Sequence, residues 1–239
     1  MKFLFILISA VISLSSVAQQ ATVVNDPNAH PRTLNASFSA ISVTDGIELY
    51  LSEGETESLA VSYADEKYAE RFKTIVEKGV LRIYFDTEGI SWSDNRKRKL
   101  KAYVSFKNLD KLTATAGADV HVPATISVKK LEMRFTSGAV FDGSVKAEIL
   151  SVDQNSGSQV SISGTVGKVE IDVSSGAIFK GYDFTADYCD ARATSGASVK
   201  IAVEKELSAR ASSGGGIHYK GTAVIKNVDV SSGGIVKKA

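Results

Sequence analysis

The chain has 239 residues, of which 44% are hydrophobic and 23% charged, a balance typical of a folded protein rather than a disordered one. Its formal net charge of +1 gives the whole molecule no electrostatic attraction to nucleic acid or to an anionic membrane, so we expect no nucleic-acid partner. Cys189 is the single cysteine, so an intramolecular disulfide cannot form and packing must supply the stability.

Residues 1–18 have the pattern of a secretory signal peptide. Met1-Lys2 supplies the positive start, an almost unbroken apolar stretch follows, and Ser16-Val17-Ala18 places small residues before a cleavage point at Gln19. The apolar stretch is too short to span a bilayer comfortably, and no later segment has the roughly 20 apolar residues of a transmembrane helix. We therefore expect an exported protein without a transmembrane helix, located in the periplasm or at the cell surface.

Two regions of lower regularity come next. Residues 19–37 are expected to form a flexible lead-in, and residues 38–116 an N-terminal β part that caps one end of a repeat domain. Apolar and polar residues alternate there in short runs, as in half-buried strands. Strands are expected at residues 41–43, 47–51, 59–63, 80–85 and 102–106. The polar stretch from Asp65 to Phe72 is expected to form a short helix with Asp65 near its N-cap.

A Ser-Gly pair recurs throughout residues 117–239. Successive glycines of the six pairs are 19, 19, 20, 18 and 19 residues apart, and Gly117 extends the series upstream by 21 residues. The pairs are Ser137-Gly138, Ser156-Gly157, Ser175-Gly176, Ser195-Gly196, Ser213-Gly214 and Ser232-Gly233. Self-similarity at a fixed period of this length is the sequence signature of a repeat architecture.

Apolar residues recur at fixed distances before each glycine. Seven residues before it stand Leu131, Leu150, Val169, Cys189 and Leu207. Five before it stand Met133, Val152, Ile171, Ala191, Ala209 and Val228, and three before it Phe135, Gln154, Val173, Ala193, Ala211 and Val230. These positions alternate with polar ones, as in residues 168–173, so they are expected to line an interior. Cys189 is accordingly expected to be a small buried hydrophobe rather than a reactive thiol.

A second apolar set follows the glycines. It consists of Val140, Val160 with Ile162, Ile178, Val199 with Ile201 and Val203, and Ile217. A further glycine often ends the set, five residues after the first in one unit and seven in the next, at Gly143, Gly164, Gly181 and Gly221. The alternation indicates units that come in pairs, with a short and a long second strand.

One unit of about 19 residues cannot bury its own apolar face, whereas stacked units can, because each strand pairs with its equivalent in the next coil at roughly 4.8 Å. We therefore predict an all-β fold, a β-solenoid with two strands and two tight turns per coil. Glycine would supply the positive φ at a corner, and the preceding serine would bond the turn backbone.

The Ser-Gly repeats, the secretory signal and the segment from Val43 to Leu51, with sequence VTDGIELYL, together resemble the "putative autotransporter adhesin head" family of Bacteroidetes, also called the GIN domain. The resemblance covers about residues 38–235. It implies a right-handed β-helix that is reminiscent of pectin lyases but lacks their catalytic residues, and a role in cell adhesion.

Candidate catalytic groups do not form a recognisable site. The turn serines would need a neighbouring base, and the chain offers only His30, His121 and His218. Ser127 to Lys130 matches an S-x-x-K pattern, but the other sequence motifs expected of a serine acyltransferase are missing. Outward carboxylates without metal-ligand spacing occur at Asp142, Asp153, Asp172, Asp187 and Asp190, and calcium stays an alternative there. We predict no catalytic, cofactor-binding or metal-ligating residues, and hence not an enzyme.

Two surfaces could bind a partner. Residues 86–101 hold Trp92 and the basic run Arg96-Lys97-Arg98-Lys99 with Lys101, which could bind an anionic glycan or be a solvated loop. A ladder of short polar groups is formed by Thr136, Asn155, Ser174, Thr194, Ser212 and Ser231.

The function expected from these features is that of a non-catalytic, secreted cell-envelope protein. It would act in adhesion, with a glycan or a cell-surface protein bound to its polar strand faces. The alternatives are a polysaccharide lyase or glycosidase on a β-helix, and a structural protein that self-associates into a homo-oligomer through its exposed C-terminal coil.

Overall fold

The computed structural model describes residues 26–88 and 95–239, so the predicted signal peptide and Trp92 lie outside the described residues. The N-terminal part contains β1 (His30–Pro31), β2 (Ala40–Val43), β3 (Glu48–Glu53), β4 (Ser58–Ser62), η1 (Glu66–Tyr68), β5 (Phe72–Glu77), β6 (Val80–Phe85), α1 (Asn95–Arg98), β7 (Lys101–Phe106) and β8 (Lys111–Ala114). The repeat part contains β9 (Asp119–Phe135), β10 (Val140–Gln154), β11 (Gln159–Val173), β12 (Ile178–Ala193), β13 (Ser198–Ala211), β14 (Gly216–Lys220), β15 (Val224–Val230) and β16 (Ile235–Lys238).

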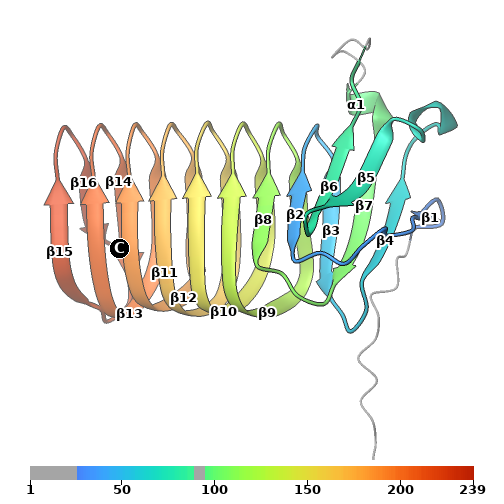
Figure 1. The fold of residues 1–239 in the computed structure, drawn as a ribbon. Helices are drawn as coiled ribbons and strands as arrows, with labels where there is room; N and C mark the ends of the chain where they lie inside the picture. The colour runs from blue at the N-terminus through green and yellow to red at the C-terminus, as the bar shows by residue number, and fades with distance from the viewer. Residues whose placement is uncertain (1–25, 89–94) are drawn as a thin grey trace, which may run out of the picture.

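The repeat part is a β-solenoid, as the Ser-Gly spacing predicts. Strands β9 to β13 lie side by side in chain order, and each pairs in parallel with the equivalent strand of the next coil (Figure 1). The last coil is divided into β14 and β15, which both pair with β13, while β16 pairs with β14. None of the helices in the described ranges is long and apolar enough to cross a membrane.

Each Ser-Gly pair forms a tight turn in which both residues have positive φ. Ser175 and Gly176 have φ values of 53° and 72°, and the Ala177 amide donates to the Ser174 carbonyl across the turn at 3.1 Å. Two consecutive positive φ values are typical of a type I′ turn. Neighbouring turns are also linked, because the Gly176 amide donates to the Ser195 carbonyl of the next coil at 3.1 Å.

The second corner differs from the prediction of two tight turns per coil. One continuous strand passes around it, so β10 to β13 each form almost a whole coil of 14 to 16 residues. The register shifts at this corner, for example between Gly143 and Val145 and between Gly181 and Thr185. Gly143 and Gly181 therefore mark bulges in a bent strand and not separate turns, whereas Gly221 lies in a bend between β14 and β15.

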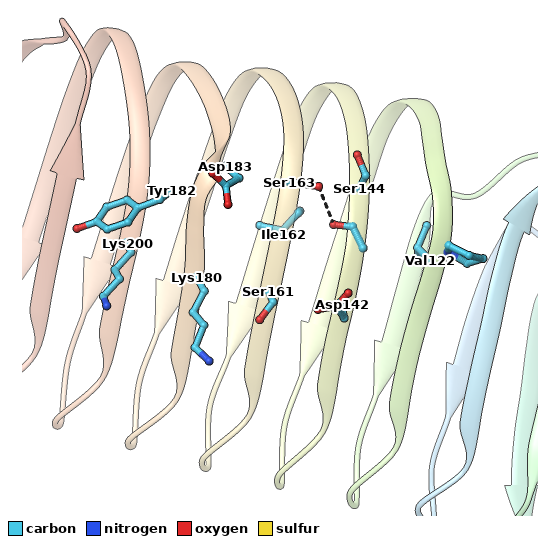
Figure 2. A pocket seen from close by; sticks show the side chains of 12 residues that line it. Val122, Asp142, Ser144, Ser161, Ile162, Ser163, Lys180, Tyr182, Asp183 and Lys200 are labelled. Carbon is cyan, nitrogen blue, oxygen red and sulfur yellow. Dashed lines mark hydrogen bonds between the residues drawn. The ribbon is translucent and has the colours of Figure 1, made fainter.

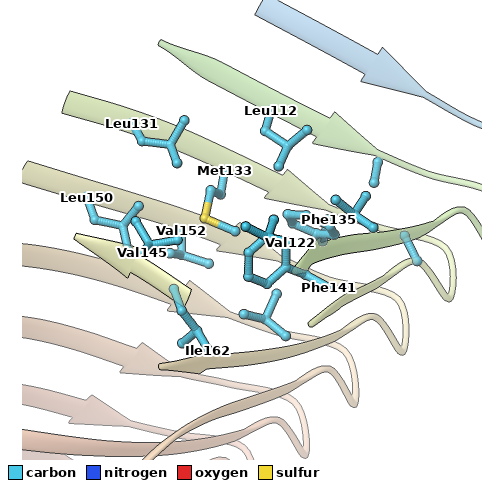
Figure 3. Packing of buried hydrophobic residues seen from close by; sticks show 14 of the residues in the cluster. Leu112, Val122, Leu131, Met133, Phe135, Phe141, Val145, Leu150, Val152 and Ile162 are labelled. Atoms are coloured by element: carbon cyan, nitrogen blue, oxygen red, sulfur yellow. The ribbon is translucent and has the colours of Figure 1, made fainter. Parts of the chain in front are cut away.

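The three predicted columns before the turn are buried from Leu131 to Ala211, and they include Cys189 at 5% exposure. The set after the turn is buried at Val160, Ile162, Val199, Ile201, Val203 and Ile217, as predicted. It is wrong at Val140 and Ile178, which face outward, while the next residues, Phe141 and Phe179, are fully buried. Figure 3 shows Phe141 in the core. A column of small residues directly after the turn glycine is also buried, and the sequence analysis missed it. Its members are Ala118, Ala139, Ser158, Ala177 and Ala197.

The N-terminal part covers one end of the coil stack. Strand β4 pairs antiparallel with β7, and β5 pairs antiparallel with β6, which interrupts the parallel pattern of the coils. The helix predicted from Asp65 to Phe72 is shorter than expected: only Glu66–Tyr68 is helical, as a 3-10 turn capped by the Asp65 side chain, and Phe72 already begins β5. Burial of Phe72 against the core ends the helix, since a strand can place that ring inward.

Part of the predicted lead-in contacts the body of the protein. Strand β1 pairs antiparallel with β4, and the Asp26 carboxylate accepts hydrogen bonds from Ser62 at 2.8 Å and Tyr103 at 2.7 Å. At the opposite end, β15 pairs with β13 and with no further strand among the described residues, and the column residues Val228 and Val230 are 44% and 47% exposed.

Candidate functional site

A groove runs across the outward face of the coils, beside the bulged corner. It has a volume of about 640 Å³ and extends over five coils, from β9 to β13. Its lining comprises Val122, Pro123, Asp142, Gly143, Ser144, Ser161, Ile162, Ser163, Lys180, Tyr182, Asp183 and Lys200. The register shifts described above lie in this lining, so the hollow is a consequence of the bent strands.

The floor of the groove belongs to one row of side chains in strict register. Asp142, Ser161, Lys180 and Lys200 lie on successive strands, β10 to β13 (Figure 2). Each of these four residues stands four places after a turn glycine. The strands on either side of β10 to β13 also place a side chain at this register position, so the row continues in both directions. We call the complete set the groove row: Tyr103, Tyr50, His121, Asp142, Ser161, Lys180, Lys200, His218 and Lys237.

The aromatic end of the groove row is tightly stacked. The Tyr50 ring lies between those of Tyr103 and His121, with centroids 5.1 Å apart in both pairs. The stacked faces contact one another, so these rings turn their edges to solvent. Burial raises the pKa of Asp119, whose carboxylate lies 3.3 Å from His121, although the histidine opposes that shift.

The other end of the groove row is basic. Two ammonium groups lie over the Tyr182 ring, with the Lys200 Nζ 5.9 Å and the Lys220 Nζ 5.5 Å from its centroid. Lys180 donates to the Gln159 side chain. Cation–π contacts of this kind hold long lysine side chains against the sheet while leaving their charge exposed.

A second, more polar cavity of about 630 Å³ lies at the N-terminal end, around Asp26, His30, Ser62 and Tyr103. The hydrogen bonds from Tyr103 and Ser62 lower the pKa of Asp26, and burial together with the Asp26 charge raises the pKa of Tyr103. These groups satisfy one another, so the cavity is an anchor for the N-terminal segment.

The structure does not bring the candidate catalytic residues together. His30 stacks on Tyr63 and His121 on Tyr50, and within the described residues no hydrogen bond joins a turn serine to a histidine. Ser127 and Lys130 are exposed on β9. No group of three or more potential metal ligands occurs in the part of the chain that the structure describes.

The scattered carboxylates are mostly paired with bases of a neighbouring coil. Asp190 lies 3.2 Å from Arg210, Asp187 lies 2.9 Å from Lys205, and Asp153 lies 3.6 Å from Arg134. In the polar ladder, Thr136 donates its hydroxyl to the Asn155 side chain of the next coil. Both sets therefore connect coils to one another.

The basic run after residue 95 is only partly a solvated loop. Arg98 is 2% exposed, and its guanidinium lies over the Phe85 ring at 4.2 Å from the centroid. Lys97 and Lys99 are exposed. Arg98 therefore packs α1 against β6 within the N-terminal part, which differs from a fully solvated loop.

The family described as "Putative auto-transporter adhesin, head GIN domain" matches residues 37–223. The chain belongs to this family. The match begins just before β2 and ends in the last coil, so a GIN domain accounts for the cap and the solenoid together. No curated protein matches the chain.

Solved structures from gut Bacteroidetes share the fold of this GIN domain. A "putative adhesin" from Bacteroides fragilis superposes with a TM-score of 0.80 at 15% identity, covering 88% of this chain and 96% of that one. A "putative adhesin" from Parabacteroides merdae gives 0.68 at 15% identity, covering 90% and 97%. A "putative lipid binding protein" from Parabacteroides distasonis gives 0.60 at 19% identity, again covering 90% and 97%.

Proposed function

We propose that this protein is an exported, non-catalytic binding module that holds an extended glycan in the groove across its coils. The observation that supports this most is the groove row, in which polar side chains repeat at the strand spacing of roughly 4.8 Å. A polymer whose monomers are about as long as this strand spacing can place one monomer over each strand. The adhesin names of the family and of its fold neighbours agree with a binding role.

The groove offers the contacts that sugars use. Ser144, Ser161 and Ser163 present hydroxyl groups, and Asp142 and Asp183 present carboxylates that accept hydrogen bonds from sugar hydroxyls. Tyr182 adds an aromatic surface at the basic end. The backbone below is held by the parallel ladder, so these groups are positioned before a ligand arrives, which lowers the entropic cost of binding.

An enzymatic role has less support from the same groove. A glycosidase needs a carboxylic acid sheltered from water beside a second carboxylate. Asp142 and Asp183 are both exposed. The groove is therefore suited to binding a glycan rather than to cleaving one.

A glycan array probed with the purified protein tests the proposal. Binding of at least one glycan family is expected, and incubation should leave the chain length of that glycan unchanged. Ser161→Trp, which fills the groove, should abolish the signal. The matched control is Ser151→Trp, because Ser151 faces outward on the part of β10 that precedes the turn. Shortening of the glycan, or equal binding by both variants, would refute the assignment.

A further inference from the structure

The basic end of the groove row is an unusual concentration of like charge. Lys180, Lys200, His218 and Lys237 occupy the same register position on β12, β13, β14 and β16. Neighbouring members are therefore about 4.8 Å apart in the direction of the hydrogen bonds. Lys220, two residues beyond His218 on β14, reaches the same face through Tyr182. Like charges directly opposite one another on neighbouring strands are unfavourable, so an anion over Lys180 and Lys200 would relieve their mutual repulsion.

Three lysines elsewhere on the coils each have a carboxylate partner on a neighbouring strand. Lys111 lies beside Glu132, Lys205 lies 2.9 Å from Asp187, and Lys226 lies 3.0 Å from Glu206. No carboxylate among the described residues lies within salt-bridge distance of the row lysines Lys180, Lys200 and Lys237, or of Lys220 beside them. These four share that feature with a few other coil lysines, such as Lys146 and Lys168, but Lys180, Lys200 and Lys237 also lie in one register row.

The charge along the groove row also has a direction. Asp142 lies only two strands from Lys180, with Ser161 between them, and Asp119 and Glu48 lie beside the aromatic end. An evenly charged polyanion such as a nucleic acid would meet these carboxylates along part of its length. A glycan with acidic groups over the lysines and neutral sugars over the serines and Asp142 keeps its charges away from Asp142, Asp119 and Glu48, and Asp183 is the one groove-lining carboxylate at its acidic end.

We propose that the basic end selects glycans that carry carboxylate or sulfate groups. This inference rests on the proposed function and specifies its ligand class. The acidic groups lie over Lys180, Lys200 and Lys220, and hydroxyl-bearing sugars extend toward Ser161. Lysine ammonium groups recognise such anions as point charges, without the fixed fork geometry that arginine would impose, so both carboxylate and sulfate fit.

The test compares matched ligands and matched variants. A panel pairs oligogalacturonate with its methyl ester, and sulfated oligosaccharides with their unsulfated forms, with binding measured by fluorescence anisotropy at low and at physiological salt. The acidic member of at least one pair should bind tighter, and its affinity should fall as salt rises. The triple variant Lys180→Gln, Lys200→Gln, Lys220→Gln should weaken that binding about tenfold or more, because three charge contacts are removed.

The triple variant Lys111→Gln, Lys205→Gln, Lys226→Gln is the control. It removes the same number of positive charges, but from lysines that already have carboxylate partners. Its affinity should stay within about threefold of the parent, since only long-range attraction changes. Circular dichroism of both variants checks that the fold is kept.

The outcomes separate the two proposals. If no glycan in the array or the panel binds, the proposed function fails. If neutral glycans bind as well as acidic ones, or both triple variants lose equal affinity, the selection for acidic groups is wrong while glycan binding stands. Equal binding of an oligonucleotide with the same number of charges would also overturn that selection, because it would indicate attraction to any polyanion.

Discussion

Gly164 offers a sharp test of the bent-strand corner. Its φ is +111°, and a Cβ added there would lie 2.2 Å from the Val145 carbonyl oxygen and 3.0 Å from the carbonyl carbon. Val145 is the register partner of Gly164 on β10, so the ladder itself occupies the space of the missing side chain. Gly164→Ala must move β10 and β11 apart or rotate a peptide, and either change breaks hydrogen bonds between the coils. We expect a loss of about 3–5 kcal/mol in the free energy of unfolding.

The matched control is Gly176→Ala in a Ser-Gly turn. Gly176 also has positive φ, at +72°, but nothing lies within 4 Å of the position that a Cβ would take. Only the conformational penalty of a left-handed alanine remains, which is about 1–2 kcal/mol. Gly221→Ala repeats the Gly164 clash, 2.2 Å from the Val203 carbonyl oxygen, but in the last coil. Its effect should be smaller than that of Gly164, because few coils depend on it.

Urea unfolding followed by far-ultraviolet circular dichroism measures all three variants. The expected order of destabilisation is Gly164→Ala first, with the other two well below it. A difference of about 2 kcal/mol corresponds to a shift of roughly 4–8 °C in Tm for a chain of this size, so thermal scans provide a second readout. If Gly164→Ala and Gly176→Ala lower the free energy of unfolding by the same amount, the corner tolerates a side chain. The close approach of β10 and β11 would then not be the reason that glycine is required at residue 164.

Three further predictions concern single side chains. Gln154 is 1% exposed in an apolar column, and its Oε1 lacks a hydrogen-bond partner. Gln154→Met should therefore raise the free energy of unfolding in urea by about 1 kcal/mol. A lower free energy of unfolding would mean that the hydrogen bond from Gln154 to the Ile178 carbonyl outweighs the cost of the unpaired oxygen. Burial raises the pKa of the Cys189 thiol to about 12. Iodoacetamide at pH 8 should therefore modify Cys189 only in denaturant, because the reactive thiolate is scarce and inaccessible in the native protein. Rapid labelling of the native protein would contradict this burial. Tyr103→Phe should raise the pKa of Asp26 in an NMR titration and speed amide exchange in β1. Because the pKa of Asp26 is lower in the folded protein than in the unfolded one, its stabilisation is present above about pH 4 and is lost as the pH falls further. An unchanged pKa of Asp26 in the variant would exclude the Tyr103 hydrogen bond as the main cause of the lowered pKa.

The interior of the coils could be predicted from the sequence because burial restricts what each position can hold. Leu150 and Ile171 recur at fixed distances from a turn glycine, and both are buried as expected. The period also predicts the turns, since a repeated positive φ favours glycine. Val140 and Ile178 were misplaced because they precede equally apolar residues, Phe141 and Phe179, and alternation alone does not say which of two adjacent apolar residues faces inward.

The groove was not predicted, although its signal is present in the sequence. Aligning the residue four places after each turn glycine gives Lys180, Lys200, His218 and Lys237 in succession. Periodicity is strongest at the apolar positions and at the polar ladder next to the turn, and this outward column is chemically mixed, so it does not stand out as a repeat. The hollow itself could not be predicted, because it depends on bulges at the second corner, and the sequence indicates tight turns at Gly143 and Gly181 equally well.

The coils separate the residues that hold the fold from those available to a ligand. Interior columns and Ser-Gly turns fix the spacing of the strands, and ion pairs such as Asp190 with Arg210 connect neighbouring coils on the part that precedes the turn. At the basic end of the groove row the contacts between coils carry no countercharge: Lys180 donates to Gln159 and Lys200 lies over Tyr182, and neither lysine has a carboxylate partner among the described residues. Their alignment in one row, without a carboxylate partner, is the arrangement that a ligand would explain. An anionic glycan over this row would supply the charge that Asp190 supplies to Arg210 and Asp187 supplies to Lys205 on the neighbouring coils.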